Sequence, residues 1–338
     1  MESRLRSPIV TRLDSLGALV EALPRGKTPR PPLSPLRGTA SRVRASVLRH
    51  RRRALADPPP SNGQPRHGLG LIRPGFNNLG PSAAFVFHFA RRHEVAVLAH
   101  ACEGEPPRPA TSIDGVRVPE DLRGRLWEVG RPHWRILSFE RASDLFLAQL
   151  LALAEVGLPG LSGEALLGSE LTFLGHSQGA LEGLLDAARL GSAGLGKVIG
   201  RVLGIAPPIG GAPMLASSRV AALTRSGAGL ADGLAAARAV EALLPGEPVR
   251  ILGRHGASAM GFHRVVAGRV GGGGSPFFRT LAYLSARGAP AWSELSDGMV
   301  TVASARLGVD PERFSLFGPP ADHDHMFEDP AVVDEVLA

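Results

Sequence analysis

A Gly-x-Ser-x-Gly pentapeptide, placed between a strand pattern and a helix pattern, is the feature that most constrains the fold of this chain. Residues 171–174 form a short apolar run, and 175–179 read Gly-His-Ser-Gln-Gly. Over 180–190, apolar residues recur at helical spacing. A strand, a tight turn and a helix in this order predict that Ser177 stands clear of the backbone where the strand ends. The two glycines permit this turn because they carry no Cβ.

A serine presented in this way is a candidate nucleophile, and the turn also predicts what surrounds it. The amide of Gln178 begins the helix, where N–H groups and the helix dipole favour an oxyanion. We interpret His176 as a side chain that supports the turn, in preference to one that transfers protons. The alternative for Ser177 is a glycine-rich strand end without chemistry.

A second glycine turn follows the predicted first strand, residues 69–72, and precedes a predicted helix at 81–92. The turn reads Arg-Pro-Gly-Phe-Asn-Asn over 73–78. We expect the amide of Phe76 to be the second oxyanion donor. The alternative is an ordinary loop between a strand and a helix.

A serine hydroxyl becomes a good nucleophile when a base, usually His oriented by a carboxylate, takes its proton. Asp297 lies in a Ser-Asp-Gly turn before an apolar run. His323 and His325 both follow the predicted final strand at 313–317. We favour His323 as the base, with His325 as the alternative.

Two aspartates, Asp322 and Asp324, alternate with these histidines and together resemble a metal cluster. Residues so close on one loop rarely supply a full coordination shell. We therefore expect no metal and no cofactor.

The remaining pattern alternates strands with helices and predicts an α/β fold with a mostly parallel central sheet flanked by helices. The further predicted strands are 94–99, 197–206 and 249–252, and the further predicted helices are 141–156 and 329–337. Residues 101–133 are expected to form a surface excursion with a strand at 135–139, and 253–294 are expected to be irregular. The Ala- and Leu-rich residues of about 212–247 predict a helical, lid-like insertion; the alternative is plain packing helices.

The charge is divided unevenly along the chain. The formal net charge is +7, but residues 1–66 hold 14 Lys and Arg against 4 Asp and Glu, and the remainder holds 24 against 27. The near-neutral body, 67–338, argues against nucleic-acid binding. We interpret 1–66 as a basic, Pro- and Arg-rich leader that is poorly ordered. The alternative is a basic surface helix that makes peripheral contact with anionic lipid.

Other sequence features bear on compartment. Cys102 is the only cysteine, so no internal disulfide can form. No run of 18 or more apolar residues and no signal-peptide pattern is visible. A cytoplasmic or peripheral membrane location is slightly favoured, and the sequence does not indicate an oligomeric state.

Taken together, the RPGFNN, GHSQG, APPIGGAP, SDGMV and DHDHMF segments resemble the α/β-hydrolase superfamily, and within it the bacterial lipases and esterases. The resemblance covers about residues 67–338 and includes the chain order Ser, Asp, His. It implies a serine carboxylic-ester hydrolase that acts through an acyl-enzyme on small-molecule or lipid esters with an apolar acyl group. The alternatives are an acyltransferase or thioesterase that uses the same triad, and a non-catalytic binding protein with this fold.

Overall fold

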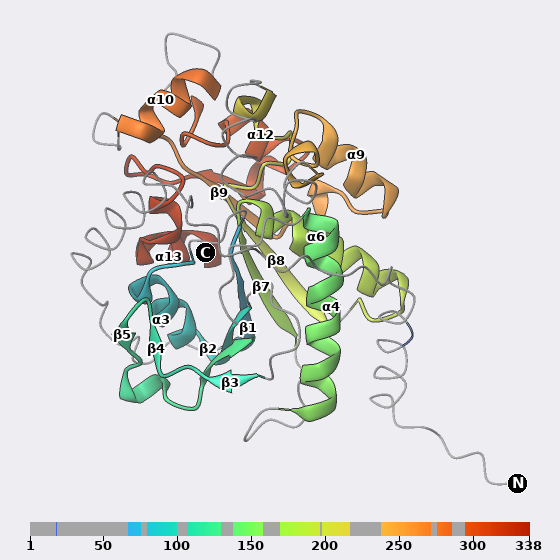
Figure 1. Ribbon diagram of the computed structural model, residues 1–338, viewed down its shortest axis with the longest axis vertical. Coiled ribbons are helices and arrows are strands. Elements are labelled where there is room, and N and C mark those ends of the chain that lie inside the picture. The colour runs from blue at the N-terminus through green and yellow to red at the C-terminus, as the bar shows by residue number, and fades with distance from the viewer. Residues whose placement is uncertain are drawn as a thin grey trace, which may run out of the picture.

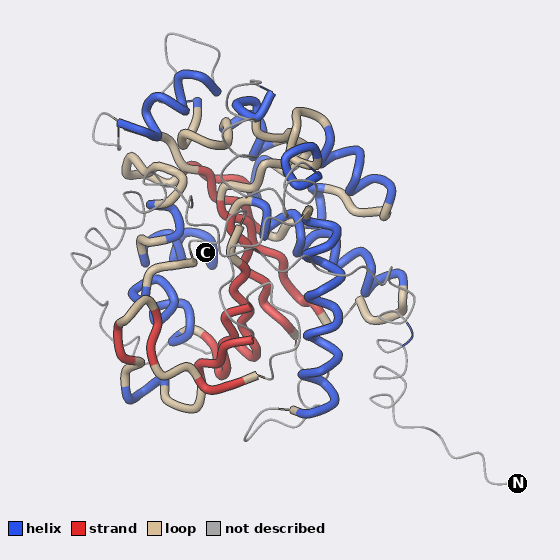
Figure 2. The backbone as a smooth tube through the Cα atoms, viewed as in Figure 1, coloured by secondary structure: helices blue, strands red, loops and turns tan. Residues whose placement is uncertain are grey.

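A single large sheet runs through the part of the chain that the computed structural model describes, namely residues 18, 67–75, 80–99, 107–129, 138–157, 170–196, 198–216, 238–271, 276–285 and 295–338. The eight strands lie in the order β10-β9-β8-β7-β1-β2-β6-β3 (Figures 1 and 2). All neighbouring pairs are parallel except β3 with β6. The predicted mostly parallel sheet is thus confirmed. The strands are β1 (His67–Arg73), β2 (His93–Ala99), β3 (Arg108–Pro109), β6 (Leu126–Val129), β7 (Leu171–His176), β8 (Ile199–Ile205), β9 (Arg264–Ala267) and β10 (Phe314–Leu316).

Helices cover both faces of the sheet. On one face α4 (Phe139–Val156), α6 (Gln178–Ser192) and α9 (Glu247–Arg254) contribute to a core that includes Phe173. On the other face α3 (Ala83–Arg91) and α13 (Pro330–Leu337) pack in a core with the next residue, Leu174 (Figure 1). Successive strand residues enter opposite cores because side chains alternate across a strand. Strand β7 is buried along its whole length, and most of its residues are accordingly apolar.

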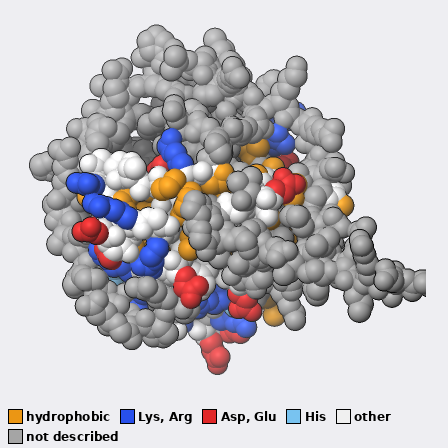
Figure 3. All heavy atoms as spheres, turned by 90° about the horizontal axis from the view of Figure 1, so that it is seen from below, with side chains coloured by type: hydrophobic (Ala, Val, Ile, Leu, Met, Phe, Trp, Pro, Cys, Tyr) orange, Lys and Arg blue, Asp and Glu red, His pale blue; other side chains and the backbone are white. Residues whose placement is uncertain are grey.

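Shorter elements complete the described chain. They are the hairpin of β4 (Ser112–Ile113) and β5 (Val116–Arg117), the helices α10 (Pro276–Ser285) and α12 (Val302–Arg306), and the 3-10 turns η1 (Glu120–Leu122), η2 (Pro213–Ala216), η3 (Ala259–Gly261), η4 (Pro311–Arg313) and η5 (His325–Phe327). Basic and acidic side chains lie among hydrophobic ones on the face shown in Figure 3.

Most predicted elements are confirmed, but the strand predicted at 249–252 is wrong. These residues lie in α9, where Pro248, Ile251 and Leu252 are buried and Val249 is exposed. This spacing is helical, and a short apolar run alone does not distinguish a strand from a helix. The strand that occupies this place in the sheet is β9, which lies with α10 in the region 253–294 that was expected to be irregular.

The predicted surface excursion at 101–133 is also partly wrong. Its strand β6 joins the main sheet beside β2 and buries Leu126, Trp127 and Val129. Phe139, assigned by prediction to a strand at 135–139, instead begins α4, because the Ser138 side chain accepts the Arg141 N–H and caps the helix. Residues 135–137 lie outside the described residues.

Two predicted regions fall largely outside the described chain. Within 1–66 only Ala18 is described, and within the predicted insertion residues 217–237 are not. Where the structure describes the chain, none of its helices has the length and apolar character needed to cross a membrane.

Candidate active site

Ser177 occupies the tight turn between β7 and α6. Its backbone has φ 55° and ψ −127°, a conformation that a residue with a side chain adopts at an energetic cost. The Ser177 N–H donates to the Ile205 carbonyl of β8 at 2.8 Å, which holds the turn in place. The turn between strand β7 and helix α6 is therefore strained, as predicted, and Ser177 lies at its apex.

Three glycines allow the turn to close. A Cβ on Gly175 would lie 2.4 Å from the Ala180 nitrogen, and one on Gly179 would lie 2.6 Å from the carbonyl oxygens of Arg73 and Pro74. A Cβ on Gly75 would lie 2.6 Å from the Ser177 Cβ. The backbone that follows β1 thus passes directly against the serine turn, and the close approach requires glycine.

Of the two predicted oxyanion donors, the structure describes Gln178 and does not describe Phe76. Gln178 is the first residue of α6. The first N–H groups of a helix have no carbonyl partner within the helix, so they can donate to a group outside it. Phe76 lies outside the described residues. Gly75, the residue before it, contacts Ser177 as described above, and the role of Phe76 stays a prediction.

The structure brings His323 and Asp297 together. His323 Nδ1 lies 2.7 Å from Asp297 Oδ2, and both side chains are buried. The other carboxylate oxygen, Oδ1, accepts the N–H groups of Met299 at 2.9 Å and Val300 at 2.8 Å. The His323 N–H also donates to the Asp297 carbonyl at 2.9 Å. A carboxylate that accepts at Oδ2 places the imidazole proton on Nδ1, which leaves Nε2 of His323 able to accept a proton.

His176, the last residue of β7, links this strand to the loop of His323. Its Nε2 lies 3.0 Å from the His323 carbonyl oxygen, which can only accept, so Nε2 carries a hydrogen. The His176 ring stacks on Phe327 at 4.6 Å and 11°, and its centroid lies 4.6 Å from that of His323. These are contacts of a supporting side chain, as the sequence interpretation expects.

His325, the alternative base, has other partners. Its Nε2 lies 3.3 Å from Asp329 Oδ2, and its N–H donates to Asp322 Oδ1 at 2.9 Å. Of the two histidines, it is His323 that contacts Asp297. Within the described ranges, no group of three or more His, Cys, Asp or Glu is arranged to hold a metal ion.

The sequence analysis did not single out a buried polar cluster behind the serine turn. Arg73 Nε donates to Glu182 Oε2 at 2.5 Å, and Asp186 is fully buried one turn further along α6. Burial raises the pKa of Glu182, although Arg73 opposes this, and it raises the pKa of Asp186 well above its usual value. Gln178, Glu182 and Asp186 are spaced four apart, a pattern that typically indicates a solvated face. Here α4 packs on that face, and only the three-dimensional structure reveals this.

The geometry defines an α/β-hydrolase fold. The evidence is the sheet order, the serine turn at the end of β7, and the positions of Asp297 after β9 and His323 after β10.

Similar solved structures include a lipase, BlEst2 in mature form, from Bacillus licheniformis (16% identity, 84% of this chain and 95% of that chain, TM-score 0.47). Others are the metagenomic carboxyl esterase MGS0156 (18%, 84% and 76%, 0.46) and one of two fungal esterases from Rhizomucor miehei (14%, 98% and 94%, 0.41). No protein-family model and no curated protein matches the chain.

Proposed function

We propose that this protein is a serine carboxylic-ester hydrolase, with Ser177 as nucleophile, His323 as base and Asp297 as the acid that orients the base. One observation supports this most strongly. His323 Nδ1 lies 2.7 Å from Asp297 Oδ2, and the loop that carries His323 is hydrogen-bonded to His176, the residue before Ser177. Residues 67–338 would form the catalytic domain, and 1–66 a separate leader.

In the first half of the proposed reaction, Ser177 Oγ attacks the ester carbonyl carbon as His323 Nε2 takes the hydroxyl proton. The imidazolium formed is stabilised by the Asp297 carboxylate, which accepts the Nδ1 hydrogen in both protonation states. The amides of Gln178 and Phe76 would donate to the oxyanion. The carbonyl then re-forms, the bond to the alkoxy group breaks, and His323 gives its proton to the departing alcohol.

In the second half, water loses a proton to His323 Nε2 and attacks the acyl-enzyme at the same carbonyl carbon. The bond to Ser177 Oγ breaks, the serine regains its proton from His323, and the carboxylic acid leaves. Throughout, the Met299 and Val300 N–H groups and the His323 Nδ1–H donate to the Asp297 carboxylate and hold it against the imidazole.

The proposed substrates are small-molecule or lipid esters with an apolar acyl group. The Ala- and Leu-rich composition of 212–247, with few charges, favours an apolar cover over the site. Its described ends are apolar as well, since Met214, Leu215, Val240 and Leu243 are buried in the core on the side of α4 and α6.

The test is hydrolysis of p-nitrophenyl esters of increasing acyl length by the parent and by Ser177→Ala. We expect the substitution to reduce kcat by roughly 10⁴-fold or more. Ser192→Ala, at an exposed serine of the same helix, is the matched control and should keep the parental kcat. Equal turnover by the parent and Ser177→Ala would reject the proposal. Product analysis with added alcohol or with a thioester distinguishes hydrolysis from acyl transfer and thioester cleavage.

A further inference from the structure

A buried ion pair lies beside the serine turn and joins the end of β1 to α6. The side chains of Arg73 and Glu182 are only 2% and 4% exposed, and they meet at 2.5 Å. Burying two charges is costly, and apolar side chains of similar size often fill such a space with no loss of stability. The pair is therefore not explained by stability alone.

The position of Arg73 connects it to the turn after β1. It is the last residue of β1, where it pairs in register with Gly175 of β7. Pro74 and Gly75 follow immediately and pack against Gly179 and Ser177. Any shift of Arg73 therefore moves the Pro74–Gly75 backbone that packs against Ser177.

The position of Glu182 connects it to the start of α6. Its Oε1 accepts from the Gln178 side chain at 3.1 Å, one helical turn before it. Gln178 supplies the first amide of α6. The same carboxylate thus bonds the residue before the β1 turn and the residue that begins the helix.

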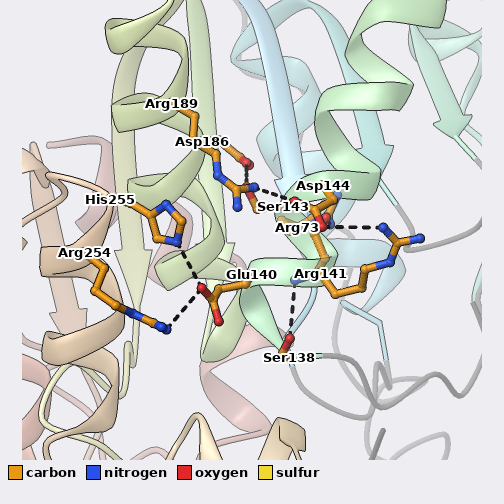
Figure 4. A network of polar contacts seen from close by, with 11 residues as sticks. Arg73, Ser138, Glu140, Arg141, Ser143, Asp144, Asp186, Arg189, Arg254 and His255 are labelled. Atoms are coloured by element: carbon orange, nitrogen blue, oxygen red, sulfur yellow. Dashed lines mark hydrogen bonds and ion pairs between the residues drawn. The ribbon is translucent and has the colours of Figure 1, made fainter. Parts of the chain in front are cut away.

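Helix α4 fixes the pair from behind. Arg73 Nη2 donates to the Ala142 carbonyl at 2.6 Å, and its guanidinium carbon lies 5.5 Å from the centre of the Phe146 ring. Further along, Ser143 of α4 donates to Asp186, and Arg189 bonds Asp144 at 2.9 Å, so polar contacts continue between α4 and α6 (Figure 4). The guanidinium plane is held on three sides, a geometry that lysine cannot reproduce.

From this geometry we infer that Arg73 and Glu182 are positioning residues that hold the Pro74–Gly75 backbone and the start of α6 in place on either side of Ser177. The inference rests on the proposed ester-hydrolase function. Neither side chain contacts substrate; each acts through the backbone to which it is attached.

The test compares the parent with Arg73→Lys and with the double variant Arg73→Met/Glu182→Leu. Lysine keeps the charge pair but cannot bond Glu182 and the Ala142 carbonyl as a fork. The double variant leaves no unpaired buried charge, so its Tm should stay close to that of the parent. On p-nitrophenyl butyrate, both variants should lose kcat by roughly 10- to 100-fold, with KM little changed. Arg189→Met, which removes an ion pair further along α6, should keep the parental kcat.

A second readout does not depend on turnover. Hydrogen exchange, followed by mass spectrometry of peptides covering 73–80 and 176–182, should be faster in both variants than in the parent and in Arg189→Met. Parental kcat and parental exchange in both variants would overturn the inference. Failure of the ester-hydrolase proposal would be seen instead in the parent, as turnover that does not depend on Ser177, and the exchange measurement would still decide whether the pair holds the two turns.

Discussion

His323 donates its Nδ1 hydrogen to Oδ2 of Asp297 across 2.7 Å, while the other carboxylate oxygen is held by two backbone amides. Asp297→Asn keeps the size of the side chain but can present an amide hydrogen to His323, which favours the wrong tautomer. We expect kcat on p-nitrophenyl esters to fall by roughly 10³- to 10⁴-fold with KM little changed. Circular dichroism and Tm should show that the variant is folded. A kcat within a few-fold of the parent would contradict the assigned role of Asp297.

The two neighbouring histidines should differ sharply in their effect on turnover. His323→Ala removes the proposed base and should lower kcat by roughly 10³-fold or more. His325→Ala removes only the contact with Asp329 and should change kcat by about 2-fold at most, with a small fall in Tm. Steady-state kinetics of both variants provide the check, and the reverse ranking would assign the base to His325.

Two glycines of α6 offer a matched pair for testing the serine turn. A Cβ at position 179 would meet backbone oxygens at 2.6 Å, whereas one at position 191 would meet nothing within 4 Å. Gly179→Ala should lower the free energy of unfolding by roughly 1–3 kcal/mol and reduce kcat. Gly191→Ala should raise stability by up to about 1 kcal/mol and leave kcat unchanged. Urea unfolding of both variants measures the difference; a Gly179→Ala variant as stable and active as the parent would count against a closely packed turn.

His176 holds the loop of His323 with one hydrogen bond and one stacked ring, and the two contacts can be separated. His176→Phe keeps an aromatic ring against Phe327 but loses the donor to the His323 carbonyl, whereas His176→Gln keeps a donor. If the hydrogen bond positions His323, the Phe variant should lose kcat by roughly 10-fold and the Gln variant should retain more of it. Equal kcat in both variants would show that the donor does not matter.

The buried carboxyl of Asp186 should make the stability of the folded protein depend on pH. In the unfolded chain its carboxyl loses the proton near pH 4, whereas burial raises its pKa in the folded protein. Between these two values the folded state binds more protons than the unfolded state, so this group makes stability fall as pH rises. Asp186→Asn should remove that contribution, and its Tm relative to the parent should increase from about pH 4 to pH 8. A difference in Tm that is independent of pH would indicate that Asp186 titrates normally.

How far the sequence predicts the fold depends on how strong each local pattern is. The strand, glycine turn and helix around Ser177 were predictable because three independent local signals agree there. The strand predicted at 249–252 was wrong because four apolar and charged residues after a proline fit a strand or a first helical turn equally well, and α9 forms instead. Strand β9 was missed because Arg264–Ala267 is short and flanked by glycine-rich segments.

The candidate site was likewise predictable from the sequence only in part. Asp297 and His323 were proposed from chain order and loop position, and the contact between them required the folded structure because they lie on different loops. The preference for His323 over His325 depends on which imidazole meets the carboxylate, which residue spacing does not determine. The Arg73–Glu182 pair was missed because polar residues at helical spacing typically mark a solvated surface, and its burial depends on α4, from another part of the chain.

The most direct test of the central claim is to trap a covalent phosphonyl adduct of the nucleophile. The parent, Ser177→Ala and His323→Ala are incubated with a fluorophosphonate, and the modified residue is located by mass spectrometry of peptides. The account predicts one modification, on Ser177 in the parent, much slower in His323→Ala and absent in Ser177→Ala. An unmodified Ser177 in the folded parent, or labelling of the parent at another residue, would contradict it.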